Sequence, residues 1–175
     1  MFRLTAFLLA VPAFAGSLQL NSAVFDTSQF RVTTFATGLF LPMSMTALSD
    51  GSIGVTSYYG GIMRFSDSNG DGIADSAGSQ IYSTTGAHTA LVKAGNYYVD
   101  GNFGDYFSGQ PDQVMTILKP GATPGSAMTV AGAIHMVFPS GWEHSQPGLA
   151  TRPTPNQPGH YDLVFNVGAQ YDSVA

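Results

Sequence analysis

The chain contains no cysteine and very little charge. The missing cysteine excludes a disulfide scaffold, a zinc site built on thiolates and a cysteine nucleophile. Only six of the 175 residues are Lys or Arg, and the net charge is −5. We therefore expect no nucleic-acid partner, because such a surface needs clustered basic residues. Charged residues make up 10% of the chain, against about 25% in soluble domains, but the 12% aromatic content argues against disorder.

The chain also lacks an apolar run long enough to span a bilayer, which takes about 20 residues. Its longest apolar stretch, residues 4–13, follows Arg3 and ends in Ala13-Phe14-Ala15. A basic start, a short apolar stretch and a small-x-small site are typical of a secretory signal peptide, although a buried first strand or a short anchor would share the apolar stretch. We expect residues 1–15 to be that signal and Gly16 to begin a secreted or periplasmic chain with no membrane span.

Short strand patterns and turn residues are abundant. There are 21 glycines and 10 prolines, and residues 30–35 alternate apolar with polar side chains, as a half-buried strand does. Asp50-Gly51 and Gly60-Gly61 are typical hairpin turns. Together these features predict four antiparallel strands of the size of one propeller blade. The expected strands are 30–35, 43–48, 53–58 and 62–65.

A weak internal repeat supports the same architecture. Thr46-Ala47-Leu48 recurs 43 residues later as Thr89-Ala90-Leu91, and four strands per 40–45 residues are typical of propellers. The closing strand of the second unit is expected at 113–118, and a third unit at 127–138 and 162–167. We therefore predict an all-β fold in residues 16–175, a partial β-propeller of two to three four-stranded antiparallel blades. It is expected to be truncated, because propellers need at least four blades; a β-sandwich would explain the same strands.

The sharpest motif is the acidic stretch 67–75, with the sequence DSNGDGIAD. Its oxygen-bearing side chains alternate, and Gly72 permits the sharp turn, so several hard oxygen ligands can converge on one calcium ion. The twelfth position is Gly78 instead of glutamate, and no helices flank the stretch, which excludes an EF-hand. The interpretations left are a calcium-bound turn and an acidic turn that binds nothing. The expected metal ligands are Asp67, Asn69, Asp71, Ile73 and Asp75.

Four histidines are the candidates for proton transfer. His144 stands beside Trp142, the only tryptophan, in a loop sequence. It is the candidate general base at a site for a sugar or polyol, with loop packing as the other interpretation. A structural role is expected for His135, in an apolar run, and a turn position for His160. His88 opens the second repeat unit, with no chemistry assigned to it.

Other potential sites have structural interpretations. Asp100 and Asp105 flank Gly101-Asn102-Phe103-Gly104. They are candidates for a pair of carboxylates at a site, but this spacing is more typical of an exposed loop, and we expect a loop. Residues 145–160 contain four prolines and are expected to be loop. The sequence contains no G-x-S-x-G elbow, no H-E-x-x-H motif and no glycine-rich phosphate loop.

The first unit resembles the opening blade of the glucose/sorbosone dehydrogenase family. The resemblance covers residues 30–75 well and 86–118 loosely, and the acidic stretch 67–75 is similar to the loop that often follows this blade. Members are exported six-bladed propellers that use pyrroloquinoline quinone. The matching segments are residues 35–39, 41–43, 48–53 and 60–65.

The same resemblance implies a function. His144-Ser145, ahead of residues 162–168, is similar to the family's catalytic histidine, although the proline-rich stretch 146–159 replaces the family's usual spacing. It implies oxidation of a sugar or polyol hydroxyl with pyrroloquinoline quinone, in which His144 takes the proton. The other hypothesis is a non-catalytic extracellular propeller, a binding or scaffold module stabilised by calcium.

Overall fold

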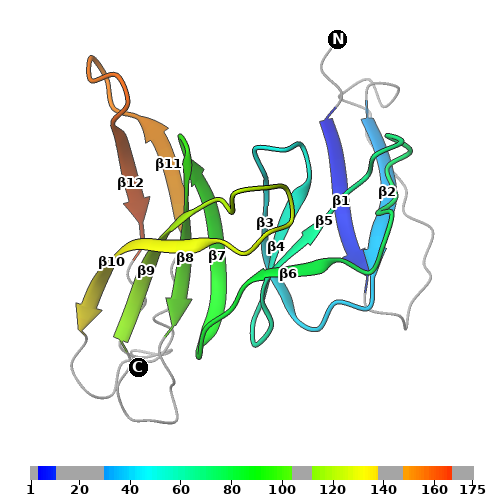
Figure 1. Cartoon of the computed structure of the whole chain (residues 1–175), viewed down its shortest axis with the longest axis horizontal. Coiled ribbons are helices and arrows are strands. Elements are labelled where there is room, and N and C mark those ends of the chain that lie inside the picture. Colours follow the sequence, from blue (N-terminus) through cyan, green and yellow to red (C-terminus); the bar gives the residue numbers. More distant parts are fainter. Residues whose placement is uncertain (1–3, 11–29, 104–111, 138–147, 167–175) are drawn as a thin grey trace, which may run out of the picture.

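The computed structural model describes residues 4–10, 30–103, 112–137 and 148–166 (Figure 1). This part of the chain forms strands and turns, without a helix that has the length and apolar character needed to cross a membrane. The expected all-β class is confirmed. The strands are β1 (Leu4–Ala10), β2 (Phe30–Thr37), β3 (Pro42–Ala47), β4 (Ile53–Ser57), β5 (Gly61–Phe65), β6 (Ser79–Tyr82), β7 (Ala87–Ala94), β8 (Tyr97–Phe103), β9 (Asp112–Lys119), β10 (Thr129–Val137), β11 (Leu149–Pro153) and β12 (Tyr161–Phe165).

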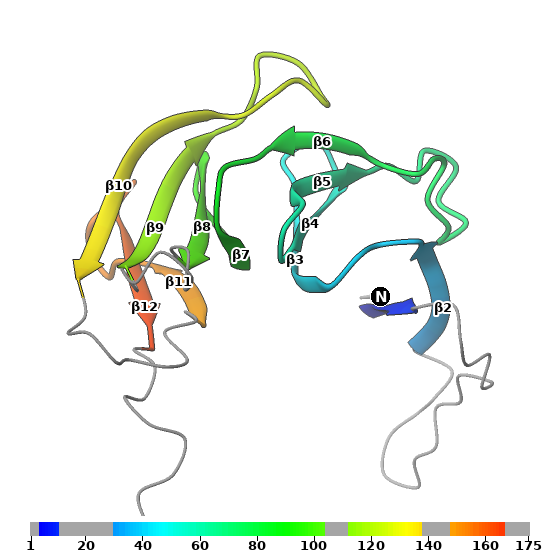
Figure 2. The same cartoon turned by 90° about the horizontal axis from the view of Figure 1, so that it is seen from below.

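Two four-stranded antiparallel sheets dominate the structure. The first sheet has the order β3-β4-β5-β6 and the second β7-β8-β9-β10, so each strand pairs with its neighbour in sequence. β3 and β7 contact each other. Seen from below, β3 and β7 lie at the centre while β6 and β10 lie at the outside (Figure 2). Successive four-stranded antiparallel sheets were expected, and two are present, but the expected first strand, 30–35, does not belong to the first sheet. It forms β2, which pairs with β1, and the fourth strand of the first sheet is β6, which was not predicted.

Glycine is required at the tight turns of the first sheet. Gly51, between β3 and β4, has a φ of +83°, and its amide donates to the Leu48 carbonyl. Gly61 starts β5 with a φ of +74°, and a Cβ there would lie 2.2 Å from the Tyr82 carbonyl oxygen. Neither a positive φ nor this close approach of backbones suits a residue with a side chain. The two turns therefore fix the register of β3, β4 and β5.

The main core lies between the two sheets. Leu48, Ile62 and Ile81 of the first sheet and its turns meet apolar side chains of the second. This burial removes the facing sides of both sheets from water, which is the main force that joins them. The second sheet and the segment before β10 contribute Leu91, Tyr98, Leu118 and Met128.

The opposite face of the first sheet carries a smaller core. Val55 and Phe65 point to this side, because alternate residues of a strand face opposite sides of the sheet, and β2 covers them with Phe35. The rings of Phe35 and Phe65 meet edge to face, with centroids 6.4 Å apart. Ala74 of the acidic loop packs against the same cluster. β2 and the acidic loop together therefore cover this face.

Further strand assignments differ from the sequence-based expectation. Residues 127–138 do not open a third unit, because β10 pairs with β9 and completes the second sheet. In the stretch 145–160, which was expected to be loop, β11 forms instead; it pairs with β12 in a separate two-stranded sheet and contacts β7. Proline-rich sequence suggests a loop, but Pro153 stands at the end of β11, where a missing amide costs little. Leu4–Ala10, inside the expected signal peptide, forms β1, which pairs in parallel with β2.

Two side-chain environments also differ from expectation. Asp100 was expected in an exposed loop but lies inside β8, completely buried. His135 was expected to pack in an apolar run, yet it is exposed on β10. β10 has no strand on its outer side in the described sheet, so the apolar residues around His135 do not surround it with a core. Asp105 and His144 lie outside the described residues.

Candidate functional site

The acidic loop, residues 67–75, folds through its own side chains. The two carboxylate oxygens of Asp67 accept hydrogen bonds from the amides of Asp71 and Gly72, at 3.1 and 2.8 Å. The Asp71 carboxylate accepts one from the Ile73 amide at 2.8 Å. Asn69 spans the turn, since its oxygen accepts from the Asp71 amide and its nitrogen donates to the Asp71 carboxylate. The alternating oxygen side chains thus lie on one tight turn, as the sequence predicts.

The acidic loop is fastened to the rest of the fold at both of its ends. The Ala74 amide donates to the Phe35 carbonyl at 2.8 Å, and the Asp75 amide donates to the Ser66 carbonyl at 2.8 Å. The Asp75 carboxylate accepts from the Ser68 amide, and this hydrogen bond lowers the pKa of Asp75. The Thr33 hydroxyl of β2 donates to the Gly72 carbonyl. Whatever rigidifies the loop therefore also holds β2 on the first sheet.

The donor set of the loop suits a hard cation. Three carboxylates, one amide oxygen and a backbone carbonyl fall within nine residues, and calcium prefers oxygen ligands of these kinds. Among the described residues, however, no three His, Cys, Asp or Glu side chains converge as metal ligands. In the loop the carboxylates accept from backbone amides instead.

A buried histidine–aspartate pair was not predicted from the sequence. Nδ1 of His88 in β7 lies 2.7 Å from Oδ2 of Asp100 in β8, and both side chains are fully buried. Tyr82 packs edge to face on the imidazole, with ring centroids 5.9 Å apart. Nε2 of His88 and Oδ1 of Asp100 have no hydrogen-bond partner among the described residues. Burial raises the pKa of Asp100, while the hydrogen bond and charge of His88 act in the opposite direction.

The register of the hairpin would not by itself have predicted this pair. The turn at residues 94–96 places Asp100 opposite Leu91, and in a regular hairpin His88 would then lie on the other face of the sheet. A β-bulge between His88 and Ala90 shifts the register so that His88 pairs with Asn102 and shares a face with Asp100. The pair is closed to solvent, so its geometry indicates a structural role and not contact with a substrate.

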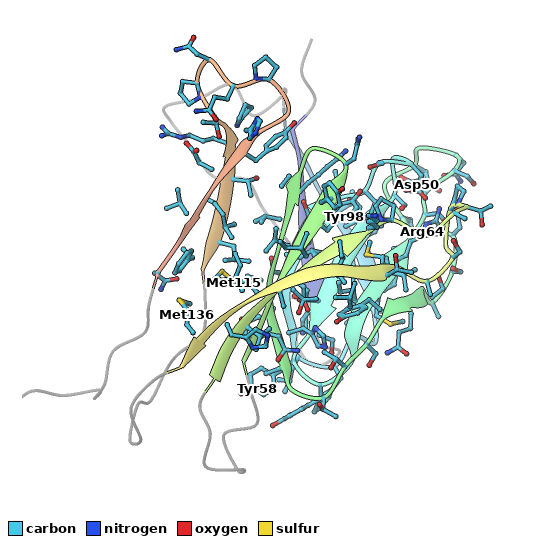
Figure 3. The ribbon with its side chains drawn as sticks, turned by 60° about the vertical axis from the view of Figure 1, so that its left-hand side comes forward. Asp50, Tyr58, Arg64, Tyr98, Met115 and Met136 are labelled. Carbon is cyan, nitrogen blue, oxygen red and sulfur yellow. The ribbon has the colours of Figure 1, made fainter. Side chains whose placement is uncertain are left out.

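A pocket of about 220 Å³ lies at the seam between the two sheets. Its base is apolar and comes from the main core. Figure 3 shows Asp50, Arg64 and Tyr98 together at this end of the molecule, with Tyr58 toward the other end. The β9–β10 loop lines one side of the pocket, and the Met128 amide donates to the Ile81 carbonyl at 2.7 Å. The lining residues are Leu48, Ser49, Asp50, Arg64, Ile81, Tyr98, Pro120, Gly121, Ala122, Thr123, Pro124, Gly125, Ser126 and Met128.

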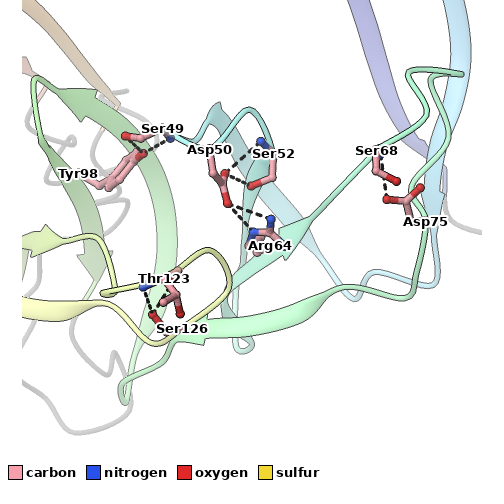
Figure 4. A network of polar contacts seen from close by, with 9 residues as sticks. All are labelled: Ser49, Asp50, Ser52, Arg64, Ser68, Asp75, Tyr98, Thr123 and Ser126. Carbon is pink, nitrogen blue, oxygen red and sulfur yellow. Dashed lines mark hydrogen bonds and ion pairs between the residues drawn. The ribbon is translucent and has the colours of Figure 1, made fainter.

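Polar contacts fix the rim of this pocket (Figure 4). Nε and Nη2 of Arg64 each lie 2.9 Å from Oδ2 of Asp50. Oδ1 of Asp50 accepts hydrogen bonds from the amide and hydroxyl of Ser52. The Tyr98 hydroxyl accepts from the Ser49 amide at 2.7 Å, which ties the second sheet to the β3–β4 turn. Burial acts to raise the pKa of Asp50, but the hydrogen bonds from Ser52 and Arg64 outweigh it and lower that pKa.

The lowered pKa of Asp50 predicts a pH-dependent contribution to stability. Its folded-state pKa lies below the ordinary value of 3.8, so the ionised group stabilises the fold above that value. This stability is lost as the pH falls through the lowered folded-state pKa. We expect Asp50→Asn to lower the free energy of unfolding by about 1 kcal/mol or less at pH 7, because the pair is partly exposed. The difference from wild type should vanish toward pH 2, as measured by urea unfolding, and an equal difference at every pH would contradict the prediction.

No protein-family model, curated protein or solved structure matches the chain.

Proposed function

We propose that the chain forms propeller-type blades of an exported binding module that calcium stabilises. The two four-stranded meanders, which meet through β3 and β7, support the propeller interpretation, since propeller blades are four-stranded sheets arranged around a central axis. The pocket between the sheets supplies a binding site. Export rests on the signal-like residues 1–15, and N-terminal sequencing of exported protein should begin at Gly16.

The attachment of the acidic loop to β2 is the observation that supports stabilisation of the fold by calcium. Residues 67–75 connect with β2 through Thr33 and Phe35. Cleavage after residue 15 would remove β1, the strand that pairs with β2. β2 would then depend on the loop and on the packing of Phe35. A cation on Asp67, Asn69, Asp71, Asp75 and the Ile73 carbonyl would reduce the repulsion between the carboxylates and hold this part of the fold together.

Calcium should therefore raise the thermal stability of the protein. At a concentration one hundred times the dissociation constant, the expected gain is about 2.7 kcal/mol, or roughly 5–10 °C in Tm for a chain of this size. Asp71→Ala should abolish the calcium-dependent shift. Differential scanning calorimetry with calcium and with a chelator measures both values.

The matched control is Asp162→Ala, at an aspartate that pairs with Arg152 on the β11–β12 hairpin. This variant should keep the full calcium response. A wild-type Tm that is the same with calcium and with chelator would show that the loop is only a turn.

Oxidation of a sugar or polyol is the second candidate function. The observation that favours it is that β3, β4 and β5 form on the segments that resemble the opening blade of the glucose/sorbosone dehydrogenase family. Pyrroloquinoline quinone, when bound, would supply the hydride-accepting chemistry, and His144 would take the proton of the hydroxyl. The sequence assigns no residue to holding the quinone. A quinone-dependent dye-reduction assay with sugars tests this candidate.

A further inference from the structure

The pocket between the sheets combines an apolar base with a single cationic group. Leu48, Ile81 and Met128 are each less than a tenth exposed, and they line the same pocket as the Arg64 side chain. Pockets with an apolar lining and a few fixed polar groups are typical of small-molecule sites. The volume of about 220 Å³ suits a molecule of about one ring.

Arg64 has hydrogen-bonding capacity that its partner does not use. A guanidinium carries five N–H donors, and Asp50 engages one edge of it, through Nε and Nη2. Among the described residues, Nη1 donates no hydrogen bond. Nη1 is directed toward the β9–β10 loop, where a Cβ at Gly125 would lie 3.8 Å from it. An oxygen atom of a bound molecule can accept a hydrogen bond at this edge.

The charge of the rim selects among possible ligands. Asp50 already neutralises Arg64 and is itself only 22% exposed, so a carboxylate in the pocket would face a nearby negative charge. An uncharged oxygen acceptor avoids this repulsion and still receives a charge-assisted hydrogen bond, which is stronger than one between neutral groups. The Ser126 hydroxyl accepts a hydrogen bond from the Thr123 amide and donates one to the Thr123 carbonyl, so it offers less to a ligand than Arg64 does.

We propose that this pocket binds an uncharged, single-ring organic molecule that has an apolar body and one accepting oxygen held by Arg64. The apolar body lies on Leu48, Ile81 and Met128. The proposal deepens the binding role given above but does not depend on calcium, because the pocket and the acidic loop share no residues. The pocket proposal can therefore be wrong while the calcium proposal is right, and the reverse.

Three probes of similar size test the chemistry in the full chain. Acetophenone has a ring and a neutral carbonyl, ethylbenzene lacks the acceptor, and benzoate carries a negative charge. Acetophenone should bind one site with a dissociation constant of about 1 mM or tighter. Ethylbenzene should bind about tenfold more weakly, because it lacks the hydrogen bond to a charged donor. Benzoate should also bind about tenfold more weakly, because the Asp50 carboxylate repels it. Titration followed by NMR shifts of the Met128 and Ile81 methyl groups measures all three constants.

Two variants locate the site. The double variant Asp50→Asn/Arg64→Met removes the donor without leaving an unpaired charge, and it should bind acetophenone and ethylbenzene equally. Ala122→Phe fills the mouth of the pocket and should abolish binding. Ala127→Phe, on the same loop but outside the lining, is the matched control and should bind as wild type does. Circular dichroism melting of each variant confirms that it is folded.

Several results would overturn the proposal. The proposal is wrong if acetophenone shows no saturable binding, or if Ala122→Phe binds acetophenone as wild type does. It is also wrong if benzoate binds more tightly than acetophenone, which would indicate an anion site. If the same samples keep the calcium-dependent Tm shift, only the pocket proposal is wrong. If acetophenone binds but calcium does not change the Tm, only the calcium part of the proposed function is wrong.

Discussion

Replacing Asp100 with alanine is expected to lower the free energy of unfolding by about 3–5 kcal/mol, because it leaves a buried polar group without its partner and opens a cavity. Asp100 and His88 are both fully buried and lie 2.7 Å apart. Without the carboxylate, Nδ1 of His88 joins Nε2 as a buried nitrogen with no partner, and the missing side chain leaves a cavity. Domains are stable by only about 5–15 kcal/mol, so the change is a large share of the total. Urea unfolding at pH 7 measures it.

Two controls separate the pair from its surroundings. The double variant His88→Leu/Asp100→Leu should cost clearly less than the two single leucine variants added together, because it leaves neither polar group alone. His135→Ala, at an exposed position of β10, should change the stability by no more than about 0.5 kcal/mol. Additive single variants would show that the two side chains do not interact in solution.

If the chain oxidises sugars, replacing His144 with alanine is expected to lower turnover about 10²–10⁴-fold, the usual contribution of a general base. A proton must leave the sugar hydroxyl during oxidation, and His144 is the group that the sequence proposes to accept it. The assay compares quinone-dependent dye reduction by wild type and variant over a panel of sugars. Melting temperature is measured on the same samples.

The His144 variant should melt at the wild-type temperature and keep its calcium response. His160→Ala is the matched control, because His160 is exposed in the turn before β12, and its turnover should stay at the wild-type value. If wild type reduces no dye with any sugar, or if His144→Ala turns over at the wild-type rate, the proposed oxidation of sugars is wrong. The binding module is then the one proposed function that is left.

The sequence by itself determined those features that depend on neighbouring residues. Asp50-Gly51 and Gly60-Gly61 predicted the hairpins of the first sheet, because only glycine accepts the backbone angles and close contacts found there. Alternating side chains predicted that residues 30–35 form a strand, but not that this strand lies outside the first sheet. The spacing of oxygen side chains in residues 67–75 likewise predicted one tight turn, since Asp and Asn bond to amides two to five residues away.

Only the tertiary structure decided the features that depend on residues far apart in the chain. Strand pairing placed β10 in the second sheet, which local alternation of side chains cannot specify. The packing of β7 against the first sheet buried His88 and Asp100, although polar residues near glycines are more often exposed. The pocket exists because the two sheets and the β9–β10 loop bring Arg64 and Met128 together from distant positions. Burial and partner choice are properties of the assembled core, whereas turns and periodicity are properties of the local chain.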